Sequence, residues 1–207
     1  EYWVRHHAEL PVLDITVVNV AMPTFQTEFD VANYSTVAWT VTAYGLPFAG
    51  LMLLGGRIGD SFGRRRMFVL GVGLFTLASL LCGFAQNQWM LIAARAFQGT
   101  GAALAAPTAF ALVASTFAPG RVRNQAFAIF GSMVAVGSVG GLVIGGALTE
   151  ASWRWIFLIN VPIGALIVLG SIFALRDTDH HRLTLDIRGA VIGTLACAAI
   201  VFGATEG

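Results

Sequence analysis

Charge is scarce in this sequence, and lysine is absent altogether. Only 11% of the 207 residues are charged, all 12 basic residues are arginine, and the net charge is +1. A soluble domain carries about 25% charged residues, so this chain has too few charges to cover a water-facing surface. A balance so close to neutral gives no reason to expect nucleic acid as a partner.

Cysteine is also rare, and neither cysteine lies where a disulfide framework would place it. Cys82 and Cys197 both sit inside apolar runs, so we interpret them as small buried hydrophobic residues. His180 and His181 form a pair without further ligands, which is weak evidence for a metal. The apolar runs contain no metal-ligand cluster and no nucleophile–base pair. The sequence therefore predicts no cofactor, no metal site and no enzymatic activity.

Apolar residues are abundant and occur in long runs. They make up 57% of the chain, and glycine occurs 24 times. About 20 apolar residues cross a bilayer as a helix, and small residues let such helices approach closely. We predict an all-α membrane protein whose spans follow seven apolar segments: Leu10–Phe29, Val37–Gly56, Met67–Ala85, Trp89–Phe117, Ala126–Leu148, Ile156–Leu175 and Gly189–Thr205.

Arginine is concentrated in alternate loops between these spans. The basic loops carry Arg57 and Arg64–Arg66, then Arg121 and Arg123, then Arg176, Arg182 and Arg188. Short arginine-rich loops stay in the cytoplasm. We therefore expect a multi-pass protein of the inner (cytoplasmic) membrane with a cytoplasmic N-terminus. Because the chain starts at Glu1 and stops after the seventh span, we expect it to be part of a longer protein.

The second and fifth spans end in a similar pattern. Gly55-Gly56 is followed by Asp60 and Arg64, and Gly145-Gly146 is followed at the same spacing by Glu150 and Arg154, 90 residues later. Two three-helix units of opposite topology are typical of secondary transporters. The alternative is coincidence in a glycine-rich membrane protein.

Asp14 lies inside the first span, between Leu13 and Ile15. An acid in the hydrocarbon region is costly and indicates a functional site. Burial favours the protonated form of a carboxyl group, which suits a proton carrier. Alternatively, Asp14 lies near the cytoplasmic interface, where it is solvated or caps a helix.

Arg95 lies near the start of the fourth span, and no acid close in sequence neutralises it. It either faces the bundle interior, where an acid, a carbonyl or water must receive it, or it extends to the outer interface. Asp14 is a candidate partner.

The segment from Gly56 to Arg66 joins the second and third spans. Its glycines, including Gly63, permit a sharp turn. Asp60 can cap the next helix or pair with an arginine of this segment, which contains Arg64 and Arg65 among its arginines. The alternative is a loop that serves only to orient the protein.

The fifth span carries glycines four residues apart, at Gly137, Gly141 and Gly145, with Gly146 beside them. This spacing gives a smooth helix face for close packing or for a sliding gate. Trp153, Trp155 and Phe157 begin the sixth span and are typical of an interfacial aromatic belt.

Four segments resemble motifs of the fourteen-span drug:proton antiporters of the major facilitator superfamily. They are Leu13–Pro23, Gly56–Arg66, Arg95–Gly101, and the span-5 glycines with Trp153–Pro162. The resemblance implies that Asp14 is a protonation or substrate-cation site and that Arg95 supports proton coupling. It also implies that the Asp60 segment locks the cytoplasmic gate and that the span-5 glycines form an interface needed for exchange.

The sequence departs from the family pattern at two motif positions. Leu142 stands where the span-5 motif usually has proline, so an argument for antiport from that proline does not apply. Ser61 stands where arginine is frequent, which removes one possible ion pair.

Under this resemblance, residues 1–175 form a six-span bundle of two inverted repeats, and residues 176–188 form a cytoplasmic loop. Residues 189–207 would then begin the link to a C-terminal half that is missing here. The whole protein would export hydrophobic or cationic drugs in exchange for protons across the lipid bilayer. The alternatives are uptake or facilitated transport of a small metabolite, and an inactive membrane fragment. The sequence does not fix the substrate, the proton stoichiometry, the direction of transport or the oligomeric state.

Overall fold

The computed structural model describes residues 18, 21–30 and 34–174, and also residues 189, 192–193, 195–196 and 199. Residues 21–28 are helical. The helices that follow are α2 (Tyr34–Phe62), α3 (Arg64–Gly83), α4 (Gln88–Thr116), α5 (Arg121–Ala151), α6 (Arg154–Leu158) and α7 (Asn160–Ala174). The described residues contain no strand, which confirms the predicted all-α class.

Five stretches in this described part are long and apolar enough to cross a membrane. They are Thr36–Phe62, Arg64–Gly83, Gln88–Thr116, Arg121–Ala151 and Arg154–Phe173, and they match the predicted second to sixth spans. Each helix begins before its apolar run, because a helix can continue into the interfacial layer. Half of the predicted first span and 11 of the 17 residues of the predicted seventh lie outside the described residues.

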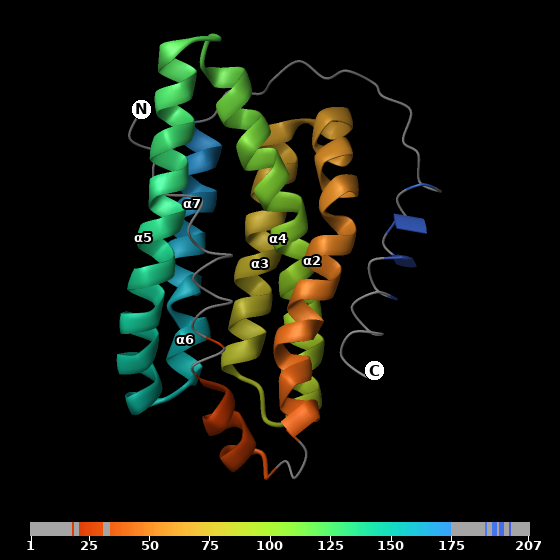
Figure 1. The fold of residues 1–207 in the computed structure, drawn as a ribbon, viewed down its shortest axis with the longest axis vertical. Coiled ribbons are helices and arrows are strands. Elements are labelled where there is room, and N and C mark those ends of the chain that lie inside the picture. Colours follow the sequence, from red (N-terminus) through yellow and green to blue (C-terminus); the bar gives the residue numbers. More distant parts are fainter. Residues whose placement is uncertain are drawn as a thin grey trace.

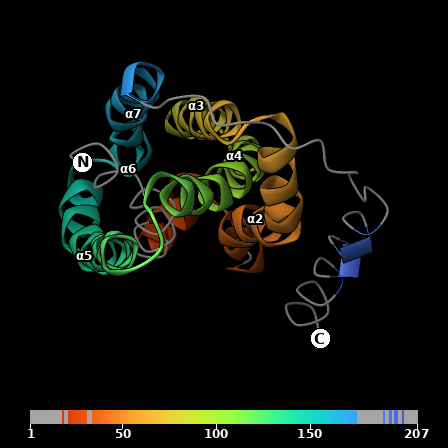
Figure 2. The same cartoon turned by 90° about the horizontal axis from the view of Figure 1, so that it is seen from above.

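Helices α2 to α5 alternate in direction, and α6 and α7 together run opposite to α5, so the connections between spans gather at two ends of the bundle (Figure 1). The end with the α2–α3 and α4–α5 connections is called the arginine-rich end, and its arginines are Arg57, Arg64, Arg65, Arg66, Arg121 and Arg123. The other end, which carries Glu28, residues 84–87 and Arg154, is called the opposite end. Seen from above, α4 lies between α2 and α3, α7 lies beside α3, and α5 is on the outside (Figure 2).

Glycines allow α4 to approach both of its neighbours closely. A Cβ added at Gly99 of α4 would lie 2.2 Å from the Tyr44 carbonyl oxygen of α2. A Cβ added at Gly71 of α3 would lie 2.6 Å from the Ala105 nitrogen of α4. Packing one leucine against another gains little free energy in lipid, because acyl chains are equally apolar. Close contact between helix backbones at small residues is therefore a principal means of packing membrane helices.

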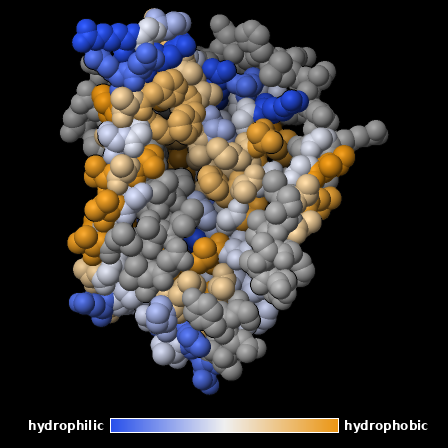
Figure 3. All heavy atoms as spheres, viewed as in Figure 1, coloured by the Kyte–Doolittle hydropathy of each residue, from blue (hydrophilic) through white to orange (hydrophobic). Residues whose placement is uncertain are grey.

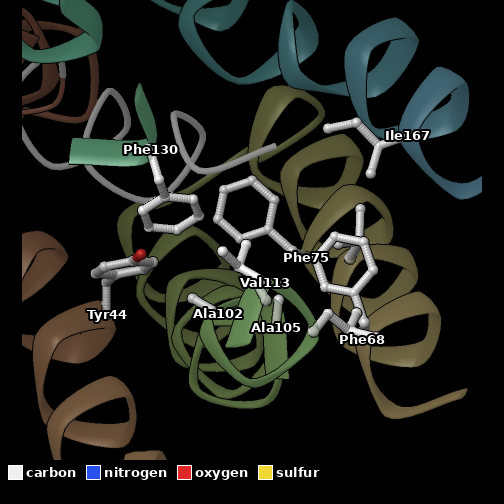
Figure 4. Close-up of a cluster of buried hydrophobic side chains, with 11 residues drawn as sticks. Tyr44, Phe68, Phe75, Ala102, Ala105, Val113, Phe130 and Ile167 are labelled. Atoms are coloured by element: carbon white, nitrogen blue, oxygen red, sulfur yellow. The ribbon is translucent and has the colours of Figure 1, made fainter. Parts of the chain in front are cut away.

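Two clusters of buried hydrophobic side chains hold the helices together. The first draws on five helices and contains Tyr44, Phe68, Val72, Phe75, Ala102, Ala105, Ala109, Leu112, Val113, Phe130 and Ile167 (Figure 4). The second lies toward the opposite end and contains Val18, Ala21, Phe25, Val37, Cys82, Ala85, Leu91, Ala94, Trp153, Ile156 and Phe157. The burial of Cys82 agrees with its interpretation as a small hydrophobic residue, and Cys197 lies outside the described residues.

Large apolar side chains also cover much of the outside. Examples are Leu53 on α2, Leu77 on α3, Val143 on α5 and Phe173 on α7, all exposed. Hydrophilic residues gather at the two ends, with hydrophobic residues between them (Figure 3). This distribution suits a protein surrounded by acyl chains.

The predicted sixth span is interrupted near its start, where α6 ends at Leu158 and α7 begins at Asn160. The prediction of an aromatic belt here is wrong for two of its three members. Trp153 and Phe157 are buried in the second cluster, and only Trp155 is exposed. Trp153 packs against Phe25 and Phe29, and Phe157 packs against Trp153.

Candidate functional site

Arg95 of α4 is buried inside the bundle, with 0% of its surface exposed. Its Nε donates to the Thr40 carbonyl oxygen of α2 at 3.1 Å, and its Nη1 donates to Gln98 Oε1 at 2.7 Å. Its guanidinium carbon lies 4.3 Å from the Tyr44 ring centroid and 5.8 Å from that of Phe157. The side chain therefore points into the bundle and not to the outer interface. Carbonyl oxygens and ring faces are both suitable neighbours for a buried cation.

Gln98 connects this charge to α3. Its Nε2 donates to Ser79 Oγ at 2.7 Å, and the Cys82 sulfur lies 3.8 Å from its Oε1. Gln98 follows Arg95 by three residues, so both side chains project from one face of α4. The Gln98 amide nitrogen faces Ser79 of α3, and its amide oxygen therefore faces Arg95.

Gln88 extends the polar contacts between α2 and α4 toward the opposite end. Its Nε2 donates to Thr40 Oγ1 at 2.6 Å and to the Thr36 carbonyl oxygen at 3.2 Å. Because Thr40 is bound by both Gln88 and Arg95, the polar groups form one continuous network. Buried polar groups of this kind specify helix positions, since each must find a partner in the absence of water.

Asp14, the other residue predicted for this site, lies outside the described residues, as do His180 and His181. Among the residues that the structure does describe, no group of three His, Cys, Asp or Glu side chains could hold a metal ion.

The segment between α2 and α3 forms a one-residue turn at the arginine-rich end. Gly63 adopts a φ of 101°, a conformation that favours glycine. Asp60 in the last turn of α2 accepts from Arg64 at 2.7 Å, and Arg64 also donates to the Ala111 carbonyl oxygen of α4 at 3.3 Å. Of the two predicted roles for Asp60, the structure shows the ion pair, because α3 has no side-chain cap. Gly56 lies within α2, where a Cβ would be in ordinary contact with Pro107.

Arg65 makes a contact that sequence reasoning missed. Its Nη2 donates to the Ile172 carbonyl oxygen at 2.5 Å and its Nε to that of Ser171 at 3.3 Å. Both acceptors lie in the last turn of α7, where carbonyls lack helical partners and cations are favoured. Arg65 therefore ties the start of α3 to the end of α7.

The opposite end holds a second arginine pair. Arg154 Nη1 donates to Glu28 Oε1 at 2.6 Å, and the Trp153 indole N–H donates to the other Glu28 oxygen. Burial of the Glu28 carboxyl group opposes its ionisation. The hydrogen bonds from Arg154 and Trp153, together with the charge of Arg154, outweigh burial and hold the pKa of Glu28 below its ordinary value.

The glycines of α5 divide between two environments. Gly137, Gly141 and Gly145 are buried, whereas Gly131 is exposed and Gly146 is half-buried with no neighbour within 4 Å of an added Cβ. The buried three are spaced by four residues, so the predicted smooth face is turned into the protein.

A charge buried at this depth, in a bundle whose outer surface suits lipid, is characteristic of membrane transport proteins. Comparison with known families agrees with that class. A sequence model of the Major Facilitator Superfamily matches residues 12–204, and the chain belongs to this family. Its members are multi-pass membrane transporters and not enzymes.

Several curated relatives have names that refer to drugs. The chain is 52% identical over 96% of its length to the "Uncharacterized MFS-type transporter EfpA" of Mycobacterium tuberculosis, of which it covers 37%. It is 43% identical over 95% of its length to the "Puromycin resistance protein pur8" of Streptomyces alboniger, covering 39% of that protein. It is 40% identical over 95% of its length to the "Cephamycin export protein CmcT" of Amycolatopsis lactamdurans, covering 41%. The chain thus spans about two fifths of these relatives, and their names agree with the drug:proton antiporter resemblance.

Solved structures show the same fold at low identity. A peptide transporter POT in complex with sulfate aligns with a TM-score of 0.75 and 16% identity, covering 98% of this chain and 44% of that one. A bacterial homologue of the lysosomal transporter Spinster, in an inward-facing conformation, aligns at 0.72 with 20% identity, covering 90% and 45%. These similarities confirm the major-facilitator type of fold.

Proposed function

We propose that the intact transporter exports hydrophobic, often cationic, drug-like compounds in exchange for protons, and that this chain is its N-terminal half. The observation that carries the proposal is the buried charge of Arg95, held between α2, α3 and α4. Relatives that confer puromycin resistance or export cephamycin support the substrate class and the direction.

The chain would contribute one wall of the transport cavity. In this proposal residues 1–175 form the six-span bundle of two inverted repeats, residues 176–188 a cytoplasmic loop, and residues 189–207 the start of the link to the second half. Coverage of only about two fifths of the relatives supports a second half. The arginine-rich end would face the cytoplasm and place the N-terminus there, because short basic loops are retained inside.

Asp14 would carry the proton, and Arg95 would support coupling. An acid that is alternately protonated and ionised near a fixed buried cation changes the electrostatic cost of each conformation, so protonation can bias the inward/outward equilibrium. Each proton that enters down a potential of 100 mV supplies about 2.3 kcal/mol to export. The gate at the arginine-rich end would be held by Gly63 and the Asp60–Arg64 pair, with Arg65 beside it.

The glycine face of α5 would complete the mechanism. Gly137, Gly141 and Gly145 are buried on one side of the helix, and Gly146 lies next to them. Such a face lets α5 bend or slide against a neighbour without a clash of side chains.

The experiment is efflux of a fluorescent cationic dye from cells that express the intact transporter, with and without a protonophore. We expect Asp14→Asn to abolish protonophore-sensitive efflux while expression stays normal. Glu150→Gln is the control, because Glu150 is exposed at the opposite end. Undiminished efflux by Asp14→Asn would remove Asp14 from the mechanism. Transport that persists after collapse of the proton gradient would instead support facilitated transport of a small solute.

A further inference from the structure

One guanidinium group joins three elements at the opposite end. Arg154, the first residue of α6, donates from Nη1 to Glu28 at 2.6 Å and from Nη2 to the Ala85 carbonyl oxygen at 3.3 Å. Glu28 lies at the end of the helical residues 21–28, and Ala85 lies two residues after the end of α3. The predicted first, third and sixth spans therefore meet at this side chain.

Trp153 gives the contact a rigid base. The indole is 1% exposed and packs edge-to-face against Phe25 at 5.1 Å and Phe29 at 5.6 Å, measured between ring centroids. The Arg154 guanidinium carbon lies 4.5 Å from the Trp153 ring centroid. Isolated surface ion pairs contribute little because both side chains must be ordered. Here the indole is already fixed by packing, and both carboxylate oxygens are engaged.

The arginine that corresponds to Arg154 in the repeated sequence pattern behaves differently. Arg64 pairs with Asp60, four residues before it. The residue four before Arg154 is Glu150, but α5 ends at Ala151 and Ser152 is extended, so one-turn spacing is lost. Arg154 instead pairs with Glu28, 126 residues away in sequence. The local pair at one end thus has a long-range counterpart at the other.

We propose that Arg154, Glu28 and Trp153 form a lock that makes the ends of the first, third and sixth spans one body. Arg154 is a positioning residue, because it holds Glu28 and the end of α3 beside the start of α6. This inference deepens the proposed transport function, because opening at this end must then occur between the locked body and the rest of the transporter. Release of the lock separates the first span from α6 and exposes the second hydrophobic cluster.

Cys82 is a native probe of that release. It is fully buried in the second cluster, three residues before the Ala85 carbonyl that Arg154 binds. The experiment measures the rate of maleimide labelling of Cys82 in the purified intact transporter. In the background protein, Cys197 and every cysteine of the second half are replaced by serine, and the temperature is kept below the onset of unfolding.

We expect Arg154→Gln and Glu28→Gln each to raise the labelling rate about two- to fivefold, the range for loss of a half-exposed ion pair. The double variant should label more slowly than the product of the two single effects predicts, because both variants remove the contact between Arg154 and Glu28. Trp153→Phe keeps the ring packing and removes the donor, and a smaller increase is expected. Arg154→Lys keeps the charge but not the fork, so it supplies a milder test if Arg154→Gln does not fold.

Arg123→Gln is the matched control. Arg123 also donates to a carbonyl oxygen, that of Phe117 at 2.8 Å, but at the arginine-rich end, so its loss should leave Cys82 labelling unchanged. Unchanged labelling in folded Arg154→Gln or Glu28→Gln, or additive effects in the double variant, would overturn the lock. Labelling at a fixed pH requires neither a proton gradient nor a drug. A responsive Cys82 in a protein without proton-coupled efflux would therefore keep the lock and reject the proposed function.

Discussion

Gly55 of α2 lies directly against Ala103 of α4. A Cβ added at Gly55 would sit 2.1 Å from the Ala103 carbonyl oxygen. Pro107 lies four residues after Ala103 in α4 and has no N–H to donate, so that carbonyl lacks its usual helical partner. The backbone of Gly55 thus occupies the space beside a carbonyl released by proline, and a side chain at this position would meet the backbone of α4.

Gly55→Ala should destabilise the transporter by about 1–3 kcal/mol, the usual cost of overpacking, since the obstacle is backbone. The measurement is the thermal unfolding midpoint of the purified intact protein. Gly73→Ala is the control, because an added Cβ there has no neighbour within 4 Å and alanine favours a helix. Equal midpoints for the two variants would contradict the importance of this contact.

Arg95→Lys should reduce drug efflux about tenfold or more even though it keeps the positive charge. A lysine ammonium group is a point donor and cannot reproduce the fork that reaches Thr40 and Gln98 at 3.1 and 2.7 Å. Efflux rates are compared at equal amounts of folded protein. Arg121→Lys, an exposed change at the arginine-rich end, should transport at the normal rate. Full activity of Arg95→Lys would show that only the charge matters.

The Glu28–Arg154 pair should make stability depend on pH. The pKa of Glu28 is lower in the folded than in the unfolded protein, so the unfolded state binds more protons between the two values. The stabilisation is complete above the unfolded-state pKa and is lost as the pH falls through the folded-state pKa. Both side chains are 37% exposed, so solvent screening limits the effect to below about 1 kcal/mol.

Unfolding midpoints of the parent and Glu28→Gln, measured from neutral to acid pH, test this dependence. The parent should be more stable at neutral pH, and the difference should shrink on acidification. Glu150→Gln, which removes an exposed carboxylate, should follow the parent throughout. If the difference in unfolding midpoint between the parent and Glu28→Gln increased on acidification, the predicted pH dependence would be contradicted.

Arg65→Gln should lower stability by about 1 kcal/mol, because two carbonyls in the last turn of α7 lose a charged donor. Arg57→Gln removes the same charge from an exposed position near the same turn, so it controls for effects on membrane orientation. Thermal unfolding of both variants in detergent gives the comparison. Similar losses in the two variants would show that charge, and not the contact with α7, is responsible.

The sequence was sufficient to predict the five spans that the structure describes. It offered the burial of Arg95 and an ion pair of Asp60 each only as one of two alternatives. Each depends on local information: an apolar run, a charge that lipid cannot accommodate, or a one-turn spacing. The Glu28–Arg154 pair could not be predicted in this way, because it joins elements far apart in the chain. Trp153 was misassigned to the membrane interface because sequence does not show that Phe25 and Phe29 cover it.

Gly63 is the single residue that connects α2 and α3. Helices of 29 and 20 residues are joined by this single residue, so neither can shift along its axis by a helical turn of about 5.4 Å without pulling the other. A displacement of α2 is therefore passed to α3, and through Arg65 to the last turn of α7. The single residue Gly63 in this way couples the movements of three helices.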